Sequence, residues 1–319
     1  MALLCYLSVT DKTMKHLLCS LFFIVAVSCC NAQKFKPALN LTKGSTYYLS
    51  SNATSEVTQT ISSEHTTINL SFAYRMAFKV IDIADSVYSM EVSYQSLNVK
   101  MEMPDNTVNF DSKNAEPQDV PSTIIAAMMN KPFNLEITKT GKVVAFKNFE
   151  KMIQGVLDGF PQIDTAKKTQ FKAMFIQSFG PVAFKRNVEA GTAIFPTGPV
   201  TKDEKWTIKT MLESPAKANV SVTYQLADVV EGLYIIHGEG KITSDKSAGP
   251  ATINGMPVKY NLNGSSISNI KIDKATGWIT EMRLRQIMVG DMKILDNPKM
   301  PGGASVPITF NIGATTTNN

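Results

Sequence analysis

Cysteine is absent from the chain after position 30. The four cysteines are Cys5, Cys19, Cys29 and Cys30. A chain cut after this segment has no disulfide, no thiolate metal site and no cysteine nucleophile. Secreted animal domains of this kind more often carry disulfides, so the absence favours a bacterial envelope protein.

Histidine is scarce as well, and only His65 and His237 follow the first thirty residues. Zinc sites need three or four Cys, His or carboxylate ligands, and no HExxH motif is present, so we predict no metal site and no cofactor. His237 and Glu239 share one strand face, where they form either an acid–base pair or an ordinary surface pair. The chain contains no GxSxG motif. A hydrolase site assembled from distant residues stays open.

Two further patterns give only weak evidence for a catalytic or phosphate-binding site. The carboxylate pairs Asp203–Glu204 and Glu136–Glu150 suit charged loop faces better than a glycosidase site. The glycine-rich stretch Gly238–Gly249 lacks the GxxxxGK[ST] spacing and precedes no helix, so it does not predict a phosphate loop. The formal charge of +5 is spread along the chain without a basic block, which excludes an evident nucleic-acid site.

One apolar run, Leu17–Cys30, follows the basic Lys15 and His16. This pattern predicts a secretory signal peptide over residues 1–32, with Met14 as the true start. Cleavage after Ala32 releases a soluble chain, whereas acylation at Cys29 or Cys30 anchors it to a membrane. Both are compatible with a periplasmic or extracellular location. No later run reaches membrane length, so no transmembrane segment is expected in the mature chain.

Two-residue alternation dominates the rest of the chain. In Asn69–Ile81, apolar and polar residues alternate strictly, which predicts a strand with one buried face. The return strand Val87–Met103 changes phase near Gln95–Ser96, which indicates a β-bulge. Short turns between successive strands favour antiparallel pairing. We therefore predict an α+β, mainly antiparallel fold, with a large curved sheet (half-barrel or open sandwich) packed on a few central helices.

The middle of the predicted single domain, 33–319, is helical over about 121–185. A short helix follows Asp119, a hairpin covers Phe133–Phe146, and Asn148 is expected to cap the next helix. A further helix begins near Asp164 and ends at Gly180–Pro181. Residues 190–205 are predicted to form a loop.

The most distinctive candidate site residues are apolar. Methionine's flexible thioether suits cavities for variable apolar ligands, and several methionines fall on helices that should face the sheet. Together with nearby aromatic residues they predict a lipid-sized groove, although the same residues would equally fill a core. The candidates are Met128, Met129, Met174, Phe171, Phe175, Trp206 and Trp278.

Three stretches carry a family resemblance: "STYYLSSNATSEVTQTI" (Ser45–Ile61), "ITKTGKVVAFKNFEKM" (Ile137–Met152) and "IKIDKATGWITEMRLR" (Ile270–Arg285). Over Leu39–Ile312 the chain resembles a family of exported Bacteroidota proteins classified as a domain of unknown function. More distantly, the layout is similar to the open β half-barrels of lipoprotein carriers, with helices against the concave face. The resemblance brings no catalytic residues.

These observations lead to three hypotheses. The first is a non-enzymatic exported envelope protein that binds or carries an apolar or amphipathic ligand, such as a lipid. The second is a structural or interaction module that pairs an exposed strand edge with another envelope protein. The third is a hydrolase whose site is assembled from distant residues.

Overall fold

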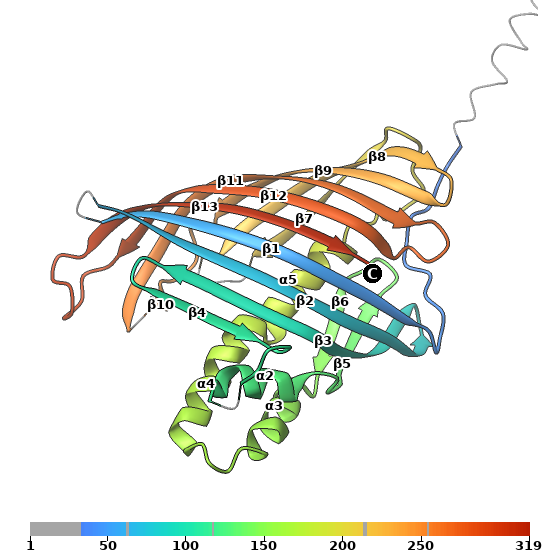
Figure 1. Cartoon of the computed structure of the whole chain (residues 1–319). Coiled ribbons are helices and arrows are strands. Elements are labelled where there is room, and N and C mark those ends of the chain that lie inside the picture. The colour runs from blue at the N-terminus through green and yellow to red at the C-terminus, as the bar shows by residue number, and fades with distance from the viewer. Residues whose placement is uncertain (1–32, 62–63, 117, 213–215, 254) are drawn as a thin grey trace, which may run out of the picture. The chain divides into compact units, whose positions relative to one another are not determined.

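Thirteen antiparallel strands form one large, curved and open sheet, as the alternation predicted (Figure 1). The computed structural model describes residues 33–61, 64–116, 118–212, 216–253 and 255–319. The expected signal peptide, 1–32, lies outside these residues. Residues Lys36–Asn319 form one compact unit, and the description below concerns that unit.

Most strands are long, which is what gives the sheet its breadth. Their bounds are β1 Thr46–Ile61, β2 Glu64–Ala84, β3 Val87–Met103, β4 Asn106–Asp111, β5 Phe133–Thr138, β6 Val143–Lys147, β7 Lys205–Leu212, β8 Ala218–Val230, β9 Leu233–Ser244, β10 Ala251–Ile253, β11 Met256–Asp273, β12 Ile279–Ile294 and β13 Ala304–Thr317. The strand order is β6-β5-β3-β2-β1-β13-β12-β11-β9-β8-β7, with β4 paired to β3 and β10 to β11. The two ends of this order do not pair with each other, so the sheet stays open.

The helices are α2 Val120–Met128, α3 Phe149–Asp158, α4 Thr165–Phe179 and α5 Pro181–Thr192. Figure 1 shows them beneath the concave side of the sheet. We call this side the inner face and the opposite side the outer face. In the described part of the chain, none of the helices has the length and apolar composition needed to cross a bilayer.

Several local predictions are confirmed. The phase change in β3 is a β-bulge, because Met76 pairs with Tyr94 whereas Arg75 pairs with Ser96, which leaves Gln95 unpaired. Asp119 and Asp164 occupy the N-cap positions of α2 and α4, and the side chain of each accepts a backbone hydrogen bond from its helix's first turn.

Asn148 occupies the N-cap position of α3 as predicted, but its side chain makes no capping hydrogen bond. It adopts a left-handed conformation, and its amide donates instead to the Asn134 side chain at 2.6 Å. The residue therefore ties α3 to the neighbouring strand β5 and does not satisfy the helix's free N–H groups.

One helix was missed. Gly180–Pro181 ends α4 as predicted, but Pro181 also begins α5, which extends the helical segment beyond residue 185 to Thr192. The predicted loop over 190–205 is therefore wrong for its first three residues, which are helical, and for Lys205, which begins β7. Proline stops a helix that precedes it, yet its fixed φ and missing N–H suit the first turn of the next one. A Gly-Pro pair in the sequence therefore does not distinguish a helix that simply ends from one that is followed at once by another helix.

Phenylalanines join the helices to the sheet. Phe133 on β5 contacts Phe149 of α3 and Phe184 of α5 edge to face, with ring centroids 5.2 Å apart in each pair. Phe179 of α4 reaches Phe72 on β2. Such pairs add to the apolar burial of each ring, so this cluster fixes the helices beneath one end of the inner face.

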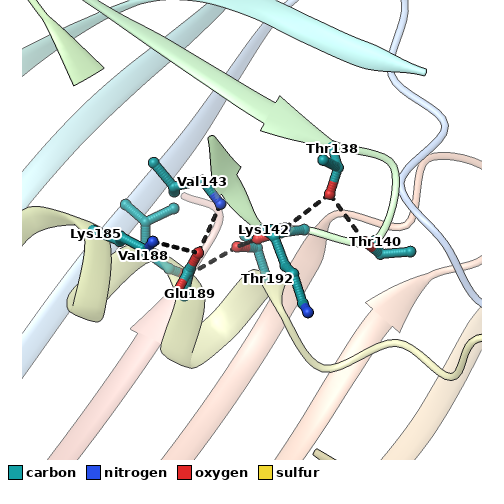
Figure 2. Close-up of polar contacts among 9 residues, drawn as sticks. Thr138, Thr140, Lys142, Val143, Lys185, Val188, Glu189 and Thr192 are labelled. Carbon is teal, nitrogen blue, oxygen red and sulfur yellow. Dashed lines mark hydrogen bonds and ion pairs between the residues drawn. The ribbon is translucent and has the colours of Figure 1, made fainter. Parts of the chain in front are cut away.

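Helix α5 is also docked by polar contacts to the β5–β6 turn (Figure 2). Glu189 accepts a hydrogen bond from the Val143 backbone N–H at 2.8 Å, and the Thr192 hydroxyl donates to the Gly141 carbonyl at 2.7 Å. Gly141 has φ +80°, and a Cβ there would overlap the carbonyl group of Thr192. Only glycine allows the turn to approach the helix this closely.

Small residues meet on the inner face of β9 and β11, which suits a bend in this curved sheet (Figure 1). We call Gly238, Gly240, Ser266 and Ser268 the crease. Gly238 pairs with Ser268 and Gly240 with Ser266. A Cβ at Gly238 would lie 2.8 Å from the ring of Tyr224 on β8 and would overlap the Ser268 hydroxyl. Glycines inside strands commonly mark such bends, because side chains would hold the strands apart.

Candidate apolar binding surface

Over the described residues of eight adjacent strands, the inner face carries a single charged side chain, the exposed Glu64 at the start of β2. The other inner-face residues, placed by alternation and register, are aliphatic or aromatic, glycine, or one of a few Ser, Thr and Gln. This holds for β7, β8, β9, β11, β12, β13, β1 and β2. Phe179 of α4 contacts Phe72, and Gly191 of α5 lies against Ile279, so this is the face against which the helices pack. The other charged side chains of these strands lie on the outer face.

The helices bury only part of this surface. Near them, inner-face side chains such as Met76, Phe78 and Ile270 are at most 3 % exposed. At the strand ends that lie away from the helices, the apolar side chains of the inner face are only half-buried. We call these the open apolar face: Val57, Ile68, Leu70, Ile208, Val220, Val222, Phe310 and Ile312. Apolar area left in water in this way can be covered by an apolar ligand.

The two flanks of the open apolar face converge on one small buried cluster, Ala218, Ile242 and Met288. Val220 of β8 and Phe310 of β13 both pack against this cluster, although three strands separate β8 from β13 in the sheet order. The cluster therefore joins the two flanks into one continuous apolar surface on the concave side of the sheet (Figure 1), which we call the trough.

The tyrosines of the inner face stay uncharged. Burial raises the pKa of Tyr224 to about 12. Burial likewise raises the pKa of Tyr74, against the smaller lowering effect of its hydrogen bond with Ser51. The pKa of Tyr94 is raised by burial and, to a lesser extent, by Tyr74. Because all three phenols are protonated at neutral pH, they do not interrupt the neutral character of the surface.

The residues predicted from sequence are not gathered in one groove. Met128, the last residue of α2, is 1 % exposed, and Met129 beside it is half-buried. Phe171 and Phe175 stack on each other within the helical cluster and are at most 9 % exposed. Met174 is 43 % exposed, so its expected place on the inner side of α4 is wrong.

The two tryptophans have structural partners. Trp278 is 4 % exposed, packs against Tyr47 and Phe78, and donates its indole N–H to the Tyr48 carbonyl at 2.8 Å. Trp206, which is half-buried, donates to the Ile194 carbonyl at 2.9 Å. Most of the predicted set thus fills the core, and ligand contact by these residues stays a prediction.

The histidine pair lies on the outer face. His237 Nε2 is 3.5 Å from Glu239 Oε1, and Nδ1 is 2.9 Å from the Asn269 side chain. Glu239 is largely exposed. Among the described residues, no group of three or more His, Cys, Asp or Glu side chains is placed to hold a metal ion.

A polar hollow of about 410 Å³ lies on the outer face around Gly313 of β13. Its lining includes Glu56, Asn69 and Arg285. A Cβ at Gly313 would find only Thr54 nearby, at 3.6 Å. Most of its lining residues are polar or glycine, so it offers little apolar contact area. It does not compete with the inner face as a binding surface.

Sequence reasoning concentrated on the helices and missed the open apolar face. The signal was present in the strands, as the alternation of Val220 with Val222 and of Phe310 with Ile312. Alternation alone shows that a face is apolar, but not whether helices cover it.

The model of the family of unknown function DUF6263 matches residues 85–279, which is more than half of the chain. The chain belongs to this family. The DUF6263 match contains all four helices and the stretch Ile137–Met152, but it leaves out Ser45–Ile61 and the end of Ile270–Arg285, and the family description names no activity. No curated protein matches the sequence.

Among solved structures, the DUF6263 chain is similar to one titled "Lipid-protein interactions in lipovitellin". The TM-score is 0.46 and the sequence identity 9 %, over 88 % of this chain. The chain spans about a quarter of the length of that structure's chain.

Proposed function

We propose that this protein binds an apolar or amphipathic ligand, such as a lipid, on its open apolar face. One observation carries the proposal: across eight strands the described inner face is apolar except for a few neutral polar residues and Glu64 at the start of β2, and its far end keeps half-buried aliphatic and aromatic side chains in contact with water. Covering such area releases about 25 cal/mol for each Å² of apolar surface. Protein sites for apolar ligands are commonly lined in this way.

Val222 is a half-buried residue of β8 on the open apolar face. Val222→Asn is expected to weaken the binding of a fluorescent long-chain fatty acid about tenfold, because an amide replaces apolar contact area. Fluorescence titration of the purified chain measures the dissociation constant.

The matched control is Ser221→Asn, the adjacent residue on the outer face of the same strand. It should leave the affinity unchanged. If both variants bind as tightly as the unchanged chain, or if the unchanged chain binds no fatty acid, the open apolar face is not a ligand site.

We also propose that the protein is exported and released by cleavage after Ala32, with anchoring at Cys29 or Cys30 as the alternative. The intact mass of the protein isolated from its own host is expected to equal that of a chain beginning at Gln33. A mass that includes the first thirty-two residues contradicts export, and a mass with added acyl chains on a terminal cysteine supports the anchored form.

A further inference from the structure

A gap interrupts the sheet on one side of β11. Strand β9 pairs with β11 as far as Thr243 and Asn263, whereas β10 pairs with it only from Val258 onwards. The stretch Lys259–Asn261 lies between these two partners. Beside it, the Ser244 hydroxyl accepts a hydrogen bond from the Leu262 N–H at 2.7 Å. The result is a hollow of about 240 Å³, lined by residues of both faces.

Positive charge dominates this gap. Its lining holds one aspartate and four lysines, Lys217, Lys246, Lys259 and Lys293. Lys259 and Lys293 are direct cross-strand partners on β11 and β12. Like charges placed opposite each other destabilise a sheet, so this pair has an electrostatic cost that a bound anion removes.

The single aspartate does not neutralise the lysines. Asp245 accepts hydrogen bonds from the Ser247 hydroxyl at 2.6 Å and from the Ser247 N–H at 2.9 Å. These two bonds, more than the nearby Lys217, lower the pKa of the Asp245 carboxyl. The carboxylate thus stabilises the turn from Asp245 to Ser247. The lysine ammonium groups form no ion pair within 4.0 Å in the described part of the chain.

The gap adjoins the apolar surface. Ser244, which lines the gap, is the register partner of Ala218 in the buried cluster beneath Val220 and Phe310. Tyr260, another lining residue, lies on the inner face, and burial raises its pKa, so its hydroxyl is a hydrogen-bond donor at neutral pH. A cationic site and the apolar trough therefore meet at the same end of the sheet.

We infer that the gap binds the phosphate group of an amphiphile whose apolar part lies on the open apolar face. The inference rests on the proposed function and adds the class of head group. Four lysines against one aspartate leave three positive charges in excess. A phosphate monoester, which carries close to two negative charges at pH 7, balances that excess better than a carboxylate does.

The experiment compares three probes on the whole purified chain at low ionic strength by isothermal titration calorimetry: dihexanoyl phosphatidic acid, dihexanoylglycerol and inorganic phosphate. Phosphatidic acid is expected to bind about tenfold more tightly than the neutral lipid, and more tightly than inorganic phosphate. In Lys259→Gln/Lys293→Gln, phosphatidic acid should lose about tenfold in affinity while dihexanoylglycerol keeps its affinity.

The control is Lys209→Gln/Lys241→Gln, which removes two outer-face lysines on either side of Ser221, away from the gap. It changes the net charge equally and should leave all three affinities unchanged. An equal loss in this control, or equal binding of the two lipids, overturns the inference and leaves the proposed function intact. Inorganic phosphate binding as tightly as phosphatidic acid also overturns the inference. Absence of binding by both lipids overturns the proposed function itself.

Discussion

Gly141→Ala is expected to lower the free energy of unfolding by about 2 to 5 kcal/mol. A left-handed conformation costs a residue with a Cβ about 1 to 2 kcal/mol, and forced overpacking adds about 1 to 3 kcal/mol. Both apply here, because Gly141 has φ +80° and its added Cβ would overlap the Thr192 carbonyl. Backbone atoms of a helix cannot rotate away as a side chain does, so α5 must move.

Urea unfolding measures this loss, and hydrogen exchange locates it. The Val143 N–H should exchange faster in the variant, because its acceptor, Glu189, lies on the displaced helix. Gly44→Ala is the matched control: Gly44 has φ +85°, and nothing lies within 4 Å of an added Cβ. It should cost only the conformational share, about 1 to 2 kcal/mol. Equal losses in the two variants would mean that α5 does not rest on the β5–β6 turn.

The second large effect is expected at the crease. Gly238→Val should destabilise the protein by about 3 kcal/mol, because its side chain must fit between the ring of Tyr224 and the hydroxyl of Ser268. Relief requires β8 to move away from β11, which flattens the sheet. The fatty-acid affinity should fall as well, since the two flanks of the open apolar face then lie farther apart.

Gly313→Val tests whether any strand glycine would behave in this way. Gly313 lies in β13, and an added Cβ would meet only Thr54 at ordinary contact distance, 3.6 Å. Valine suits a strand, so the free energy of unfolding should change by less than about 0.5 kcal/mol. A loss at Gly313 as large as that at Gly238 would contradict the role of the crease in bending the sheet.

Local patterns in the sequence predicted local structure well. Strict alternation located the strand around Met76, the phase change located the bulge at Gln95, and Asp164 located the start of α4. Each of these features depends on residues close together in the chain. The errors at α5 and Met174 have another origin: Pro181 suits both the end of one helix and the start of the next, and the exposure of Met174 depends on what packs against α4.

The candidate sites depend even more strongly on contacts between residues that are far apart in the chain. Lys259 and Lys293 lie thirty-four positions apart and Lys217 farther still, so no motif connects them. They meet because β11 pairs with β12 in one particular register and because β9 leaves β11 early. A register shift of one residue would move every side chain to the opposite face.

Periodicity in the sequence was enough to predict a mainly antiparallel β protein with one apolar sheet face and a helical middle, because two-residue and 3.6-residue repeats mark strands and helices directly. How much of that face the helices cover, which strands approach each other closely, and which lysines share a gap became visible only in three dimensions. These features depend on strand register, on the close approaches at Gly141 and Gly238, and on packing between distant segments.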